Sequence, residues 1–348
     1  MEITKKIFGT TKDNRDIFCY TLKNANGMSA TISEFGGVIV NLLVPGKDGQ
    51  LRDVVLGYDN AAPYYENNEF MGATVGRSAN RINGAAFELD GVKYQLPVNE
   101  NTNNLHSDTE NGFHKKLWTA APDESRNSVT LSYTSPDGEN GFPGNLDMRV
   151  TFTLSDDNGL SIHYEGVSDK KTVINCVNHT YFNLAGHKSG TILDHYIKID
   201  ASAYTPVRSD SIPTGEIATV KGTPFDFLDF HKIGERIEED NEQLHFTGGY
   251  DHNFVIDKTG QVVTTVEERN AGIRMEVITD LPGIQFYAGN FIRDNLSGKD
   301  GAVYGKRCGL CLETQYFPDS VNQEAFKSPV FAAGEKYDTT TTYKFSVI

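Results

Sequence analysis

Two segments of the chain place residues that can transfer protons inside runs that alternate like β-strands. In residues 172–184, one face of an extended strand would carry His179 and Tyr181. In residues 309–317, Glu313 follows a short run of apolar and small residues, which makes it a candidate for partial burial. Burial raises the pKa of a carboxyl group towards a useful base strength at neutral pH. The local sequence nevertheless favours ordinary roles, a hydrogen-bonded histidine on a half-exposed sheet and a solvent-facing glutamate on an edge strand.

Further candidates for a binding site lie in predicted loops. Asn80 and Arg81, then His106, and then Asp251 are surface residues by default, although loops are also where sites are built. The sequences GxxxxGKS/T and GxGxxG, which bind phosphates and nucleotides, are missing, and so is the GxSxG sequence of many hydrolases. The polar and aromatic end of the strand at His179 suits a sugar, which needs hydrogen bonds for its hydroxyls and a flat apolar surface for its C–H groups.

Cys308 and Cys311 form a CxxC sequence, which could be half of a zinc site or a redox pair. The sequence contains no second CxxC and no HxH or HExxH. The pair also lies in a run that is typical of a strand, where positions three apart point to opposite faces. We interpret both cysteines as structural and predict no metal site.

Apolar alternation with a period of two, broken by turn sequences, predicts a chain rich in antiparallel strands. Asp90-Gly91 joins two alternating runs, and this dipeptide strongly favours a hairpin because both residues tolerate positive φ. Other strands are predicted at 38–44, 129–133, 148–154, 160–164, 262–266 and 273–277. Helical spacing occurs at 230–237. Together these patterns predict an all-β fold, a large antiparallel β-sandwich with few short helices, in a single domain spanning 1–348.

The composition argues against several classes of function. A formal net charge of −15 argues against a nucleic-acid partner, because phosphates require a basic face. No stretch approaches the roughly 18 apolar residues of a membrane-spanning helix. Residues 1–7 lack the apolar core of a signal peptide, which predicts a cytoplasmic protein unless a leader has been removed. The oligomeric state is left open.

Many segments along the chain occur together, and in this order, in one family: 76–82, 104–106, 113–118, 137–144, 178–186, 204–207, 212–216, 222–227, 249–252, 282–287 and 313–319. The chain thereby resembles the galactose mutarotases, or aldose 1-epimerases, over nearly its whole length. The resemblance implies a large β-sandwich with a sugar cleft across one sheet. It also implies a cofactor-independent isomerase that interconverts the anomers of a free aldohexose, with galactose or glucose as the expected substrate.

By this resemblance Glu313 matches the catalytic base and His179 the catalytic acid, with His106 as the rival for the acid. The positions that match residues holding the sugar are His106, Asn80, Arg81, Tyr181, Asp251 and Gln285. In one departure, Ser107-Asp108 follows His106 where the family commonly has Gly-Gly. This change puts the shape of the loop, and the range of substrates, in question.

Exchange of anomers requires two coordinated proton transfers, from the C1 hydroxyl to a base and from an acid to the ring oxygen. We expect Glu313 to be ionised and His179 to be protonated in the productive state. Three alternatives use the same fold. A sugar-phosphate epimerase would need a basic cluster at the cleft, a non-catalytic carbohydrate-binding protein would not need both Glu313 and His179, and a lyase or hydrolase would need room for a polymer.

Overall fold

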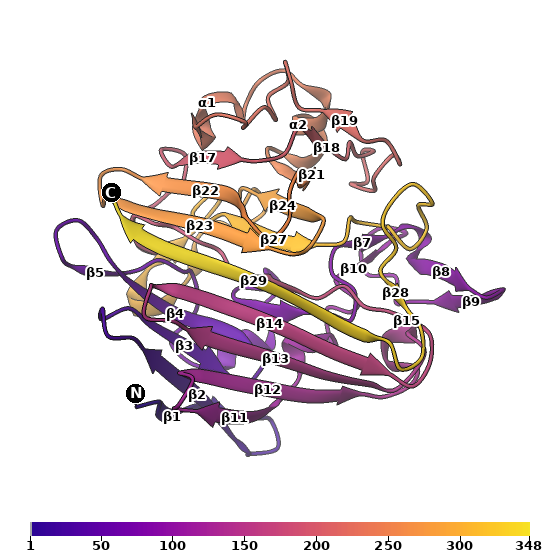
Figure 1. Cartoon of the computed structure of the whole chain (residues 1–348), viewed down its shortest axis with the longest axis horizontal. Coiled ribbons are helices and arrows are strands. Elements are labelled where there is room, and N and C mark those ends of the chain that lie inside the picture. Colours follow the sequence, from indigo (N-terminus) through magenta and orange to yellow (C-terminus); the bar gives the residue numbers. More distant parts are fainter. Residues whose placement is uncertain (1) are drawn as a thin grey trace.

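The largest sheet has nine antiparallel strands, in a computed structural model that describes residues 2–348. In sheet order the strands are β11 (Thr119–Asp123), β12 (Ser128–Ser135), β13 (Leu146–Leu154), β14 (Gly159–Ser168), β29 (Lys336–Val347), β23 (Ile273–Thr279), β22 (Val262–Glu268), β17 (Tyr196–Ile199) and β20 (His231–Lys232). The C-terminal strand β29 runs through the middle of this sheet (Figure 1). Buried and more exposed residues alternate along β13, as the apolar pattern predicts.

Two five-stranded antiparallel sheets form the second layer of the sandwich. The first contains β1 (Thr4–Thr10), β2 (Asp16–Lys23), β3 (Ser29–Ser33), β4 (Val38–Pro45) and β5 (Leu51–Asp53). The second contains β19 (Ala218–Thr219), β18 (Ala203–Tyr204), β21 (Asp251–Val255), β24 (Gly283–Tyr287) and β27 (Cys311–Gln315). A short pair, β6 (Ala73–Val75) with β16 (Val177–His179), links the two sheets, because β6 contacts β4 and β16 contacts β27.

The core lies between the two layers and includes side chains from all three sheets, such as Ile32, Phe152 and Phe286. Burying a side chain of this kind contributes about 1.5–3 kcal/mol. One hydrogen bond also crosses the layers beside β27, since the Tyr343 hydroxyl donates to the Leu312 carbonyl at 2.9 Å. This hydrogen bond joins β27, the strand that carries Glu313, to the C-terminal strand β29 in the opposite layer.

The remaining elements are short. Four further strand pairs are β7 (Arg81–Ile82) with β10 (Asn104–Leu105), β8 (Ala86–Leu89) with β9 (Val92–Gln95), β15 (Thr172–Val173) with β28 (Val330–Phe331), and β25 (Leu296–Ser297) with β26 (Val303–Tyr304). The helices are α1 (Ile233–Arg236) and α2 (Glu242–Thr247), with 3-10 turns at Ala62–Tyr65, Asn83–Ala85, Phe113–Lys115, Glu139–Gly141 and Lys299–Gly301. Within residues 2–348, neither helix reaches the length or apolar character needed to cross a bilayer.

The structure confirms the all-β sandwich with few short helices and most of the predicted strands. The hairpin at Asp90-Gly91 is β8–β9. The strands predicted at 148–154 and 160–164 pair as β13–β14, and those at 262–266 and 273–277 pair as β22–β23. Two predictions are wrong in detail. Residues 172–184 form two short strands, because the Asn175 side chain turns aside to bond both backbone groups of Tyr316. The helix predicted at 230–237 is a single turn, α1, preceded by β20.

Candidate active site

His179 and Glu313 lie on strands that run side by side at the centre of the second layer. His179 ends β16, and Glu313 is the middle residue of β27. The two strands are in contact but belong to different hydrogen-bonded sheets. A pair of backbone hydrogen bonds between Phe182 and Leu310 holds the segments together just beyond the site.

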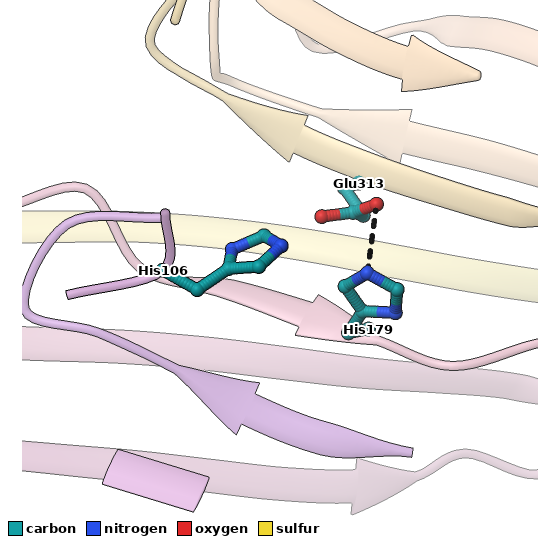
Figure 2. A group of neighbouring side chains, drawn as sticks. All are labelled: His106, His179 and Glu313. Carbon is teal, nitrogen blue, oxygen red and sulfur yellow. Dashed lines mark ion pairs between the residues drawn. The ribbon is translucent and has the colours of Figure 1, made fainter. Parts of the chain in front are cut away.

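The two side chains face each other across this junction, with His179 Nε2 3.5 Å from Glu313 Oε1 (Figure 2). Both are buried, with 5% and 2% of their surfaces exposed. A third ring, His106, lies edge-on to His179 with the ring centroids 5.3 Å apart. Phe70 packs against both imidazoles and so fixes their positions. One carboxyl group and two imidazoles are thus within reach of a single small molecule.

The Glu313 carboxyl group has an unused hydrogen-bonding atom. Its Oε2 is buried and has no hydrogen-bond partner within residues 2–348. Leaving such an atom unpaired costs about 1–3 kcal/mol, so a ligand hydroxyl bonded to it would recover that energy. Burial raises the pKa of Glu313 well above its ordinary value, and the charge of Asp251 adds to this rise, whereas Arg81 opposes it.

Burial disfavours the charge on both His179 and Glu313. Burial lowers the pKa of His179 to about 4, while the pKa of Glu313 is raised. These shifts favour a neutral imidazole and a protonated carboxyl group. Both directions oppose the expected pair, an ionised Glu313 beside a protonated His179, and that pair stays a prediction for the productive state.

The backbone fixes His106 in one tautomer. Its Nδ1 accepts a hydrogen bond from the Asn80 backbone N–H at 3.1 Å, so the neutral ring carries its proton on Nε2. Protonating Nδ1 would set two N–H groups against each other and break this bond. Burial, and then the neighbouring His179, lower the pKa of His106 well below its ordinary value. His106 is consequently a neutral hydrogen-bond donor towards the cleft.

This tautomer also bears on metal binding. The ligand atoms of His106, His179 and Glu313 lie within 4.8 Å of one another, a spacing that could hold a metal ion. A histidine that ligates a metal almost always donates the N–H of its other nitrogen to an acceptor. In His106 the other nitrogen accepts from the Asn80 N–H, so Nε2 has no free lone pair while this bond is made. These three residues fit proton transfer better than metal ligation.

Three adjacent strands supply the polar face of the second sheet. Asp251 of β21 pairs with Tyr287 of β24, and Gln285 of β24 pairs with Glu313 of β27. Directly paired residues share a face, and so do residues two apart, so all four side chains leave the same face of the sheet. The register of β21, β24 and β27 thus brings together residues that are far apart in the sequence.

Three of these side chains, those of Asp251, Tyr287 and Glu313, line a cleft with a volume of about 450 Å³. The predicted site residues that line it are Asn80, Arg81, His106, His179, Tyr181, Asp251 and Glu313. Gln285 does not line the cleft, but its amide donates to the Asp251 carboxylate at 2.7 Å. Gln315, which the sequence did not single out, donates in turn to Gln285 at 3.0 Å. A chain of side-chain amides therefore orients the Asp251 carboxylate.

The aldose 1-epimerase family profile matches residues 19–344 of the chain. The galactose mutarotase of Bos taurus is 41% identical over 349 aligned residues, which cover 100% of this chain and 99% of that relative. The chain belongs to the aldose 1-epimerase family. The aldose 1-epimerase of Escherichia coli (strain K12) is 35% identical, with 93% of this chain and 94% of that relative covered. Among solved structures, the galactose 1-epimerase from Lactobacillus acidophilus NCFM has a TM-score of 0.86 at 29% identity, with 99% of each chain covered.

In this member of the aldose 1-epimerase family, Arg81 forms an ion pair with Glu100. Its Nε and Nη2 donate to the two carboxylate oxygens of Glu100 at 2.6 and 2.8 Å. Burial disfavours the charge on Arg81, but Glu100 together with Asp251 and Glu313 outweighs burial and raises the pKa of Arg81. The positive charge in turn lowers the pKa of both Asp251 and Glu313, against the effect of their burial. Glu100 was missed because no local pattern marks a loop carboxylate as the partner of a particular arginine.

The loop after His106 has Ser107 and Asp108 at the positions where the family commonly has two glycines. Ser107 has a φ of 68°, a left-handed conformation that glycine adopts at little cost. This conformation explains why the family commonly has glycine there. The Ser107 hydroxyl accepts from the Ser78 backbone N–H and donates to the Ser78 carbonyl, both at 2.9 Å. The Asp108 carboxylate accepts from two following backbone N–H groups at 2.7 and 2.9 Å. Side-chain hydrogen bonds therefore hold the loop in place.

Cys308 and Cys311 are both buried free thiols. The Cys311 Sγ lies 3.5 Å from His179 Nδ1, a contact that the sequence did not reveal because the partners are on different strands. Burial raises the pKa of Cys311 well above its ordinary value, so the group stays a thiol. A thiol can donate to a bare ring nitrogen or accept from a protonated one. Cys311 therefore permits His179 to take up and release a proton.

Proposed function

We propose that the protein is a cofactor-independent aldose 1-epimerase in which Glu313 is the base and His179 the acid. Glu313 takes the proton of the C1 hydroxyl while His179 gives a proton to the ring oxygen. The bond between C1 and the ring oxygen breaks, and C1 becomes the carbonyl carbon of the open aldehyde. After rotation about the C1–C2 bond, Glu313 returns a proton to the carbonyl oxygen and His179 removes one from the attacking hydroxyl.

The observation that carries this proposal is the buried pair with opposed pKa shifts. Ring opening leaves the open aldehyde with a neutral Glu313 and a neutral His179. This is the arrangement that desolvation favours. The arrangement that starts the reaction, an ionised Glu313 and a protonated His179, contains the same number of protons. Donation from sugar hydroxyls to the unpaired Oε2, together with the charge of Arg81, stabilises the ionised carboxylate.

His179 is favoured over His106 as the acid on hydrogen-bonding grounds. His179 can be protonated on both nitrogens, because its Nδ1 neighbour is a thiol that can also accept a hydrogen bond. His106 cannot be protonated at Nδ1 without losing its bond from Asn80. We assign to His106 the role of donating its Nε2–H to a sugar oxygen. Asn80, Arg81, Tyr181 and Asp251 complete the wall that receives the sugar.

The charges of the cleft disfavour a sugar phosphate as the substrate. Arg81 is paired with Glu100, and Arg293 at the rim is paired with Glu69. Each arginine is thus already neutralised by a carboxylate, and two more carboxyl groups line the cleft. Phosphate recognition favours cations whose charge is available to the phosphate. A neutral aldohexose, galactose or glucose, is the substrate that we infer, and we infer that the protein acts in the cytoplasm.

The experiment that tests the proposal follows the optical rotation of freshly dissolved α-galactose. Glu313→Gln keeps the shape of the side chain and removes the base, so kcat should fall by about 10²- to 10⁴-fold. Isothermal titration with galactose should still detect binding. The matched control is Glu276→Gln on β23, which is outside the cleft and should retain wild-type turnover. Near-normal turnover by Glu313→Gln would refute the assignment.

A further inference from the structure

We infer that Cys311 is a positioning residue for the acid of the site. Its sulfur accepts the Nδ1–H of His179, which keeps Nε2 as the nitrogen that exchanges a proton with the sugar. This inference rests on the proposed function, because it takes His179 as the acid. Cys311 does not line the cleft, so it acts on the sugar only through His179.

One face of β27 contacts both nitrogens of the His179 ring. Cys311 and Glu313 are two residues apart on this strand, so their side chains leave the same face. The Cys311 Sγ lies 3.5 Å from Nδ1, and the Glu313 Oε1 lies 3.5 Å from Nε2 (Figure 2). Cys311 is fully buried and pairs with Tyr287 of β24, so the sheet fixes the place of its sulfur. The strand that carries the base therefore also sets the orientation of the acid.

The aromatic neighbours of the His179 ring do not determine this orientation. Phe70 and Tyr181 pack against the ring, with centroids 5.8 and 5.1 Å from its centroid. A half-turn about the Cβ–Cγ bond exchanges Nδ1 with Cδ2 and Nε2 with Cε1, while the outline of the ring stays almost the same. After such a turn, a carbon atom would face Glu313 in place of Nε2. Within residues 2–348, Cys311 is the only side chain in hydrogen-bonding contact with Nδ1, and this contact favours the productive orientation.

Two acceptors hold the proton of the neutral ring on Nδ1. Burial lowers the pKa of His179 to about 4, and a hydrogen bond to the backbone of the same residue opposes this fall in pKa. A partner that raises the pKa of an imidazole stabilises its protonated form, so the backbone group is an acceptor. Sulfur is the second acceptor, and a weak one, so it orients the N–H without attracting a full positive charge as a carboxylate would. Nδ1 then keeps its proton throughout the reaction, and Nε2 gains and loses one.

His106 carries its proton on the opposite nitrogen. Its Nδ1 accepts from the Asn80 backbone N–H at 3.1 Å, so its Nε2 is a donor. The two rings lie 5.3 Å apart, and the site thus holds one imidazole of each tautomer. His106 offers an N–H to the sugar, whereas neutral His179 offers a bare nitrogen. A bare nitrogen is the form that removes the proton of the attacking hydroxyl when the sugar ring recloses.

Cys311→Ala and Cys311→Ser test the inference, because both shorten the side chain to a similar size and only serine keeps an acceptor. Removing one hydrogen bond shifts the balance between two ring orientations by about two- to tenfold. In polarimetry on α-galactose, Cys311→Ala should therefore lower kcat about fivefold and leave KM nearly unchanged. Cys311→Ser should keep kcat within about twofold of the wild type.

The matched control is Cys308→Ala, since Cys308 is another buried free thiol of the same segment and does not line the cleft. This variant should retain the wild-type kcat, and circular dichroism with thermal melting checks that every variant is folded. Nitrogen-15 NMR of the free protein supplies a measurement that a purely structural role would not affect. His179 should be the Nδ1–H tautomer in the wild type and a mixture of tautomers in Cys311→Ala.

Three results would overturn the positioning role and leave the proposed function intact. These are a wild-type kcat in Cys311→Ala, equal losses of kcat in Cys311→Ala and Cys311→Ser, and an Nε2–H tautomer at His179 in the wild type. A wild type that does not accelerate mutarotation overturns the proposed function itself. The tautomer is measured without turnover, so the two failures are distinguishable.

Discussion

The hydrogen bond between the Asn80 backbone and His106 predicts that the two histidines of the site respond differently to substitution. To serve as an imidazolium acid, His106 would have to lose the bond at Nδ1 and leave the buried Asn80 N–H without a partner. That loss costs about 1–3 kcal/mol. This cost adds to burial and to the neighbouring His179, which lower the pKa of His106 well below its ordinary value. His179 has no such restraint at its Nδ1, which contacts the Cys311 thiol.

Two matched variants test this difference by polarimetry on α-galactose. His179→Gln removes the acid and should lower kcat by about 10²- to 10⁴-fold. His106→Gln removes one hydrogen bond to the sugar, and a net loss of about 0.5–1.5 kcal/mol corresponds to a rise in KM of roughly two- to tenfold. Nitrogen-15 NMR of the free protein gives an independent measurement, in which His106 should remain the Nε2–H tautomer across neutral pH. Equal losses of kcat in the two variants, or an Nδ1–H tautomer at His106, would refute the reasoning.

Two further predictions concern charge. Asp251→Asn removes a charge that raises the pKa of Glu313. In pH-dependent polarimetry the acid limb of the kcat/KM profile should therefore move to lower pH, and KM should rise. An acid limb that does not move would contradict this coupling between Asp251 and Glu313. Lys299→Met breaks the buried ion pair between Lys299 Nζ and Asp53 Oδ2 (2.7 Å) and leaves the Asp53 charge uncompensated. The loss of about 3–5 kcal/mol should lower Tm by roughly 4–7 °C in calorimetry. Adding Asp53→Asn should recover part of this loss, and no recovery in the double variant would contradict the pairing.

Local sequence carried the information for hairpins and little of the information for the site. The β8–β9 hairpin follows from Asp90-Gly91, since a turn depends on adjacent residues. Helix α2 was missed although its ends are marked: the Asn241 side chain caps the first turn and Gly248 ends it at a φ of 65°. The break in 172–184 could not be seen, because it depends on Asn175 bonding Tyr316, which lies 141 residues later.

The site residues were found by their likeness to a family, whereas their protonation depends on the assembled fold. The carboxyl of Glu313 belongs to β27 and the imidazole of His179 to β16, and nothing in either segment specifies that they meet. Once they meet, burial disfavours the charge on each of them, which opposes the expected pair of ions. The pairing of Arg81 with Glu100 is likewise a property of tertiary structure, because it joins residues on separate loops or strands.

The central place of β29 has a consequence for the order of events during synthesis. This strand ends at Val347 and pairs with β14. A hydrogen bond between the side chains of His163 on β14 and Asp338 on β29 joins residues that are 175 positions apart in the sequence. Until β29 has been synthesised, β14 and β23 each have an unpaired edge, and the layer beneath Glu313 is incomplete. Such distant pairing makes folding slow and leaves exposed edges open to aggregation. The cleft is therefore fully supported only once β29 has paired, and a chain that lacks this strand is a target for chaperones and proteases.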